Sequence, residues 1–95
     1  MAIRVLIERE IEPGNELKLH QTLTQLRAEA TMAKGYISGE TLRSLDNPNR
    51  FLVISTWNSI EDWKNWENSA ARKKYREGLR DTMRCAEKTV VYTYM

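Results

Sequence analysis

The segment of residues 50–57 constrains the fold more than any other part of the sequence, because it carries apolar side chains at successive positions. Its β-branched and aromatic residues predict a strand. Successive side chains of a strand point to opposite faces, so Phe51 and Val53 face one way and Leu52 and Ile54 face the other. The sequence therefore predicts a sheet that is covered on both faces.

Three further segments have the alternation typical of strands: residues 3–11, 36–46 and 89–94. In the first of them Ile3, Ile7 and other apolar residues share one parity, which predicts one buried face. A turn-forming sequence, Asp46-Asn47-Pro48-Asn49, separates the second segment from residues 50–57 and predicts an antiparallel hairpin.

The two longer connections between the predicted strands have apolar residues at helical spacing, which predicts helices there. In residues 16–33 one stripe of a helix would hold Leu19, Leu23, Leu26 and Ala30, while Leu17 points away from it. Gly35 supplies a stop signal for this helix. Ser59 with Asp62 resembles a capping box for a short helix, and Ser69 can cap a longer one that reaches about Arg84.

The order of these elements is β-α-β-β-α-β, which predicts the ferredoxin-like α+β fold with a four-stranded antiparallel sheet. The chain has 95 residues, enough for one domain over residues 1–95 with one core. In this topology both helical regions cover the same face of the sheet. The other face of a monomer is expected to be polar.

The second face of the predicted sheet is instead apolar. Beside Leu52 and Ile54, it would carry Leu6, Leu42, Val90, Tyr92 and Tyr94. Soluble monomers rarely expose a large contiguous apolar patch, so we expect a homodimer that packs sheet against sheet. The alternative is that these residues are scattered surface apolar residues, which are common.

Composition excludes several classes of protein. A net charge of +2 is small for a nucleic-acid-binding protein, and acidic residues interleave the basic residues at 72–84. The single cysteine, Cys85, cannot form an intrachain disulfide or a thiolate cluster. No apolar run reaches the length of a membrane span, and residues 1–4 lead directly into a strand. We therefore expect a cytoplasmic protein with no membrane and no nucleic-acid partner.

Several separated blocks of the sequence resemble the antibiotic biosynthesis monooxygenase (ABM) domain family. The blocks are Pro13-Gly14, residues 35–42, Asn47-Pro48, residues 51–57 and residues 59–69. They cover nearly the whole chain in the order that the family has. The resemblance implies a dimeric α+β barrel of two ferredoxin-like protomers, with a substrate pocket between the sheet and the helices of each protomer.

Some members of this family degrade heme, and the resemblance allows that branch to be tested. They use an Asn on the first strand, a Trp after the third strand and a His on the last helix as iron ligand. Ile7 stands at the Asn position, Trp66 at the Trp position and Arg76 at the His position. Because Arg76 stays protonated, it cannot ligate iron. We therefore expect neither a heme cofactor nor a metal site.

Candidate site residues follow from the resemblance and from side-chain chemistry. The candidate catalytic residues are Trp66, Arg76, Tyr75 and His20, and the candidate pocket residues are Ile7, Trp63 and Arg72. Indole faces hold planar aromatic molecules, and the phenol of Tyr75 can donate a hydrogen bond to a bound carbonyl. Arg72 and Arg76 lie one helical turn apart and can address an acidic or phenolate-like ligand.

Each candidate also has a purely structural interpretation. Trp57, Trp63 and Tyr75 can be core residues that pack the helices on the sheet. The alkyl stems of Arg72 and Arg76 can lie over the core while their charged ends reach solvent. His20 lies beside the apolar stripe of its helix, where a single histidine is usually a surface or packing residue.

The resemblance favours a cofactor-independent monooxygenase that acts on a planar aromatic of the quinol or polyketide type. In that chemistry the anion of the substrate itself reduces oxygen, and the protein supplies a dry pocket that stabilises the anion. The alternative is a non-catalytic homodimer of the same fold that binds a small ligand or is associated with stress.

Overall fold

The computed structural model describes residues 1–95 as four strands and three helices. In chain order they are β1 (Ile3–Glu10), α1 (Glu16–Ala30), β2 (Tyr36–Arg43), β3 (Arg50–Trp57), α2 (Ile60–Glu67), α3 (Ala70–Arg80) and β4 (Lys88–Thr93). The predicted β-α-β-β-α-β order is confirmed, with the second helical region divided into α2 and α3.

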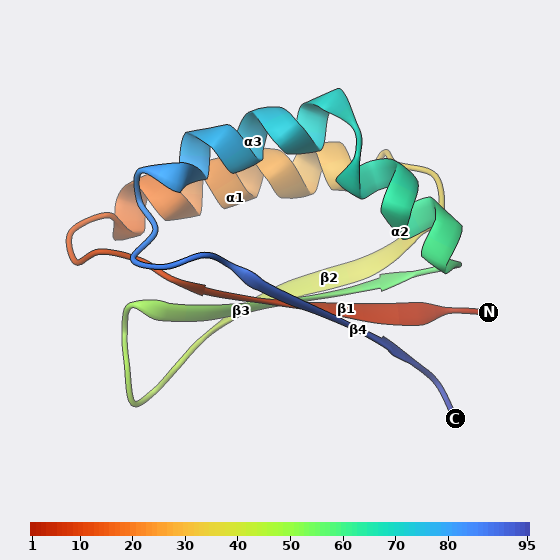
Figure 1. The fold of residues 1–95 in the computed structure, drawn as a ribbon, viewed down its shortest axis with the longest axis horizontal. Coiled ribbons are helices and arrows are strands. Elements are labelled where there is room, and N and C mark those ends of the chain that lie inside the picture. Colours follow the sequence, from red (N-terminus) through yellow and green to blue (C-terminus); the bar gives the residue numbers. More distant parts are fainter.

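The strands form one antiparallel sheet in the order β2-β3-β1-β4. All three helices lie on one face of this sheet, and α1 and α3 run side by side over it (Figure 1). This is the ferredoxin-like α+β arrangement predicted from the sequence. Its four-stranded sheet leaves the second face without any covering element of this chain.

Serine side chains cap the N-termini of two helices, α2 and α3. The Oγ of Ser59 accepts a hydrogen bond from the Asp62 amide at the start of α2, and the Oγ of Ser69 accepts one from the Arg72 amide at the start of α3. Both caps satisfy amides that have no partner inside the helix. The cap at Ser69 thereby fixes the position of Arg72 in the first turn of α3.

Two helices end earlier than the sequence periodicity predicts. Helix α1 stops at Ala30 instead of residue 33, and the chain then turns tightly toward Gly35. Helix α3 stops at Arg80 instead of about residue 84. There the Arg84 amide donates to the carbonyl of Glu10, and the segment forms a bridge beside β1. Backbone pairing with β1 thus replaces the last helical turn.

The buried apolar residues form two clusters between the sheet and the helices. The larger cluster contains Ile3, Val5, Ile7, Leu26, Ala30, Trp57, Trp63 and Trp66. The smaller cluster contains Ile11, Leu19, Phe51 and Leu79. Along β1, Arg9 lies between Ile7 of the larger cluster and Ile11 of the smaller one, and only 2% of its surface is exposed. A buried charge therefore interrupts the core.

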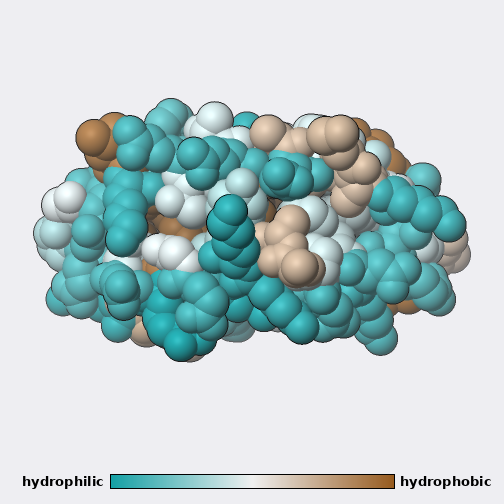
Figure 2. All heavy atoms as spheres, turned by 90° about the horizontal axis from the view of Figure 1, so that it is seen from above, coloured by the Kyte–Doolittle hydropathy of each residue, from teal (hydrophilic) through white to brown (hydrophobic).

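The two surfaces of the protomer differ in character. The helix side is covered largely by hydrophilic residues (Figure 2). On the open sheet face, strand register groups six apolar residues: Leu6, Leu42, Leu52, Ile54, Val90 and Tyr92. Charged residues, among them the pair Arg4 and Glu40, lie around this group. No helix is long and apolar enough to cross a membrane.

Gly35 precedes the pocket residue Tyr36, and the backbone explains why glycine stands there. Its φ of 86° lies in the left-handed region that favours glycine, as does the φ of 92° at Gly14. A Cβ at residue 35 would overlap the Asp62 side chain, whereas a Cβ at residue 14 would meet open space.

We predict that Gly14→Ala lowers the free energy of unfolding by about 1–2 kcal/mol, the cost of a left-handed backbone alone. Gly35→Ala lowers it by at least about 1 kcal/mol more, because the side chain of Asp62 must also move. Urea denaturation of both variants measures the difference. Equal costs would contradict the packing described at Gly35.

Candidate functional site

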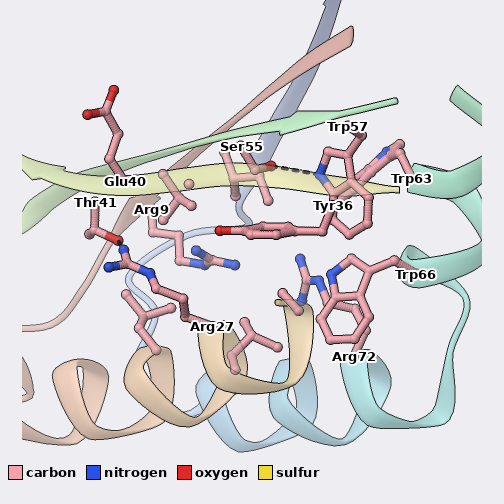
Figure 3. Close-up of a pocket in the computed structure, with 16 residues that line it drawn as sticks. Arg9, Arg27, Tyr36, Glu40, Thr41, Ser55, Trp57, Trp63, Trp66 and Arg72 are labelled. Carbon is pink, nitrogen blue, oxygen red and sulfur yellow. Dashed lines mark hydrogen bonds between the residues drawn. The ribbon is translucent and has the colours of Figure 1, made fainter. Parts of the chain in front are cut away.

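A cavity lies between the sheet and the helices, at the end of the core that the tryptophans occupy. Strands β1, β2 and β3 form one wall, and side chains of α1, α2 and α3 form the other (Figure 3). The free space is about 60 Å³, which accommodates a few water molecules. The resemblance placed a pocket between the sheet and the helices, and the structure has one there.

Aromatic rings make up one end of the cavity. The Trp57 ring stacks with Trp66 at a centroid distance of 6.3 Å and meets the edge of Trp63 at 5.7 Å. Trp57 Nε1 donates a hydrogen bond to Ser55 Oγ, so its polar atom is satisfied inside the core. These tryptophans belong to the core and also line the cavity.

Tyr36 lies across the middle of the cavity (Figure 3). Its ring meets Trp57 edge-on at 5.3 Å and runs over Gly39, where an added Cβ would lie 2.5 Å from the phenol oxygen. The hydroxyl makes no hydrogen bond to the other residues drawn in Figure 3. Tyr36 is half-buried, so it is an aromatic donor near solvent that also fills much of the cavity.

Two arginine side chains project into the cavity from opposite layers. Arg9 comes from β1 and Arg72 from α3, and each is 2% exposed. Both pair with Glu87, which lies just before β4: Arg9 Nε is 3.0 Å from Oε2, and Arg72 Nη2 is 3.4 Å from Oε1. Arg76 Nε is 3.7 Å from Oε1 of the same carboxylate. One negative charge therefore faces three positive charges.

Burial lowers the pKa of both the Arg9 and the Arg72 guanidinium, while the charge of Glu87 acts in the opposite direction. The positive charge of Arg76 lowers each pKa further. Arginine nevertheless stays protonated in proteins, so both groups keep their charge at neutral pH. The lowered pKa values mean that folding places these charges in an unfavourable environment.

The two guanidinium groups also have donors without partners. Arg9 Nη1 and Arg72 Nη1 are both buried, and neither makes a hydrogen bond. Native proteins leave few buried polar groups unpaired, because each one costs the desolvation of that group. Both atoms belong to residues that line the cavity. Each guanidinium therefore has an N–H group without a partner, and an acceptor brought beside it would satisfy that group.

Polar residues of α1 and β2 lie at the more exposed side of the cavity. Arg27 donates a hydrogen bond to Thr41 Oγ1 and so links the two elements there. The Glu40 carboxylate points away from the cavity in Figure 3 and lies 3.9 Å from Arg4. Glu40 is therefore not directed at a ligand in the cavity.

The structure brings together four of the candidate residues and leaves three outside. Ile7, Trp63, Trp66 and Arg72 line the cavity. Tyr75 packs against the larger apolar cluster, and Arg76 approaches the cavity only through Glu87. His20 is exposed on α1, and the structure does not bring it into the cavity.

Several lining residues were not among the sequence candidates, notably Arg9 and Tyr36. Parity could have identified Arg9, because it shares the buried face of β1 with Ile7 and Ile11. The role of Glu87 had no sequence signal, since it lies in a connection and its partner Arg9 is 78 residues away.

No group of three or more His, Cys, Asp or Glu side chains converges in a way that could hold a metal ion. The polar groups that line the cavity are instead the guanidinium groups of three arginines, the phenol of Tyr36, two hydroxyls and the carboxylate of Glu40, which points away from it. The guanidinium, phenol and hydroxyl groups can bind an anion and donate hydrogen bonds, and the aromatic rings can hold a flat molecule.

The fold and the cavity define a small ferredoxin-like α+β protein with a pocket between its sheet and its helices. Residues 2–78 match the sequence profile of the antibiotic biosynthesis monooxygenase family. The chain belongs to this family, as its motifs indicated.

Solved structures share this fold at low sequence identity. The chain is similar to a Nitrosomonas europaea protein assigned to the same family, with a TM-score of 0.92, 16% identity and coverage of 99% of this chain and 90% of that one. It is also similar to SnoaB, a cofactor-independent oxygenase from Streptomyces nogalater, with a TM-score of 0.89, 13% identity and coverage of 99% and 93%. At these identities the similarity extends to the fold alone.

Among curated proteins, the chain is 27% identical over 67 residues to the protein SchA of Streptomyces halstedii. It is 25% identical over 67 residues to a 42.8 kDa protein of the whiE locus of Streptomyces coelicolor. Each match covers 70% of this chain but only 18% and 17% of those longer proteins.

We predict that Glu87→Gln lowers the free energy of unfolding by about 3 kcal/mol, because it leaves two buried guanidinium groups without a counter-charge. The matched control is Glu77→Gln, which breaks the exposed pair with Arg80 and should cost less than about 0.5 kcal/mol. Denaturant unfolding compares the two. Similar small losses would contradict the role assigned to Glu87.

Proposed function

We propose that this protein is a cofactor-independent monooxygenase that converts a planar phenol or quinol-type aromatic into a quinone. The observation that carries the proposal is that one cavity combines the rings of Trp57, Trp63 and Trp66 at one end with two buried guanidinium groups. Its relation to the ABM family and its structural similarity to SnoaB, described as a cofactor-independent oxygenase, support it.

The aromatic rings at one end of the cavity favour a flat ligand. Offset and edge-to-face contacts between rings add to the stabilisation that comes from burying their area. A ring placed beside Trp57 and Trp66 would contact both indoles and lie close to the guanidinium of Arg72 (Figure 3). Because the free space is about 60 Å³, Tyr36 must swing outward to admit a molecule of two or three rings.

The arginines favour the ionised form of such a ligand. A phenolate is stabilised by nearby positive charge and by hydrogen-bond donors, so its pKa falls on binding. Ionisation raises the electron density at the ring carbon opposite the oxygen, which is the carbon that reacts with O₂. Arg9 and Arg72 thus stabilise the anion, and the site needs no side chain that acts as a general base.

The reaction balances without an external reductant. The activated ring carbon forms a bond to one atom of O₂, and the O–O bond then breaks. One oxygen remains in the quinone, and the other leaves as water with the two hydrogens that the substrate loses. The substrate supplies the electrons, and the protein excludes bulk water and positions the anion.

We further propose that two protomers pack through their open sheet faces. The apolar group on this face includes Leu42, which is 46% exposed, and Tyr92, which is 55% exposed. An apolar centre with charged residues around it is typical of protein interfaces. In a two-fold dimer the same face of both protomers forms the interface, so each apolar group would cover the other.

For the activity, we predict that anthrone or 1-naphthol gives oxygen uptake of one O₂ per quinone, with label from ¹⁸O₂ entering the product. Arg72→Met lowers the rate by about 100-fold, because it removes a donor to the anion. Arg80→Met, on the exposed side of α3, leaves the rate unchanged and is the control.

Absence of uptake above autoxidation in buffer, with folded protein and both substrates, would contradict the oxygenase proposal. Binding of the aromatic without turnover would favour the non-catalytic ligand-binding alternative. Accumulation of hydrogen peroxide would show oxidation without oxygen insertion and would also contradict the proposal.

For the assembly, we predict a light-scattering mass of two 11.2 kDa chains at micromolar concentration. Ile54→Glu places an unpaired charge at the centre of the open face and shifts the protein to monomer. Leu45→Glu, in the hairpin loop where Leu45 is fully exposed, leaves the mass unchanged. A monomeric wild type, or a dimeric Ile54→Glu variant, would contradict this interface.

A further inference from the structure

We propose that the natural ligand of the cavity carries a carboxylate on its aromatic ring, and that Arg9 and Arg72 bind this carboxylate through their unpaired Nη1 atoms. The inference rests on the proposed function in one respect, the planar aromatic nature of the ligand. It goes further by assigning a second functional group to that ligand and a binding subsite for it.

The number and position of the unpaired donors favour a carboxylate. Arg9 Nη1 and Arg72 Nη1 are buried without a partner, and they belong to different elements, β1 and α3. In Figure 3 both guanidinium groups lie in the space between the sheet and the helices. A carboxylate has two oxygens and can accept from two separate donors at once. The single oxygen of a phenolate offers a poorer match.

The charges in the interior are not balanced. Arg9 and Arg72 are both buried and share one carboxylate, that of Glu87, whereas the third arginine that faces it, Arg76, is 41% exposed and is screened by solvent. Buried arginines normally have a counter-charge of their own, because an uncompensated ion in the interior is costly. The buried groups therefore carry a net charge of +1, which one ligand carboxylate would neutralise.

Glu87 fixes the orientation of both arginines. Its Oε2 accepts from Arg9 Nε at 3.0 Å, and its Oε1 accepts from Arg72 Nη2 at 3.4 Å. Each guanidinium group is therefore held through one nitrogen while its Nη1 remains unpaired. Such preorganisation reduces the entropy that binding must overcome. The arrangement is that of an anion subsite with its donors already positioned.

The surroundings of this subsite are apolar. The tryptophans at one end of the cavity lower the local dielectric, which strengthens a charge-assisted hydrogen bond. The same surrounding makes the empty donors costly. A hydroxyaromatic acid satisfies both features, since its ring contacts the indoles and its carboxylate reaches the arginines.

Two matched ligands test the inference. 1-Hydroxy-2-naphthoate carries the acid, and 1-hydroxy-2-naphthamide has the same shape without the charge. Calorimetric titration of the wild-type protein should show that the acid binds about 10- to 100-fold more tightly, the range expected for hydrogen bonds to a charged group.

Two arginine variants test where the preference arises. Arg9→Met and Arg72→Met keep a long apolar stem and should each reduce the preference for the acid to less than about threefold, because binding of the charged acid weakens more than binding of the neutral amide. Arg80→Met should keep the full preference, because Arg80 lies on the exposed side of α3. Thermal unfolding establishes that each variant is folded.

Equal affinities for acid and amide in the wild type would overturn the inference, and this comparison needs no variant. A preference that persists in both Arg9→Met and Arg72→Met would also overturn it. Failure of both ligands to bind would contradict the aromatic site itself. Loss of oxygen uptake with preserved acid preference would instead contradict only the oxygenase proposal.

Discussion

The ion pairs of Glu87 with Arg9 and Arg72 are the interaction on which the site depends. They join β1 to α3 through a carboxylate that lies outside both elements. Without them, two guanidinium groups would be buried between apolar clusters with no counter-charge. With them, the core accommodates the two buried guanidinium groups, each of which keeps an unpaired Nη1. The same contacts therefore maintain the fold and create the proposed anion site.

The fold divides the remaining tasks between the two faces of the sheet. The helix side holds the cavity, where Trp57, Trp63 and Trp66 provide flat apolar surface and Tyr36 occupies the space that a ligand needs. The open side has the apolar group proposed to bind a second copy. An aromatic anion held in a dry, positively charged cavity is the reactant that oxygenation without a cofactor requires, and this links the electrostatics of the core to the proposed reaction.

Much of the fold could be predicted because strand alternation and serine caps are local signals. The strand of residues 50–57 and the caps at Ser59 and Ser69 were confirmed. The helix ends at Ala30 and Arg80 were not predicted, since tertiary backbone pairing near Arg84 ended α3. At the site, the structure places Trp66 in the lining of the cavity, whereas His20, Tyr75 and Arg76 do not line it. The partnership of Arg9 with Glu87 joins residues too distant in sequence for any periodicity to reveal.

A crystal structure of the protein with 1-hydroxy-2-naphthoate bound would show whether the arginines form an anion site. We expect the naphthalene ring to lie against Trp57 and Trp66, with Tyr36 displaced from the middle of the cavity. We expect the ligand carboxylate to lie within hydrogen-bond distance of both Arg9 Nη1 and Arg72 Nη1. A ligand bound elsewhere, or one whose carboxylate points to solvent while both nitrogens stay unpaired, would contradict the anion site.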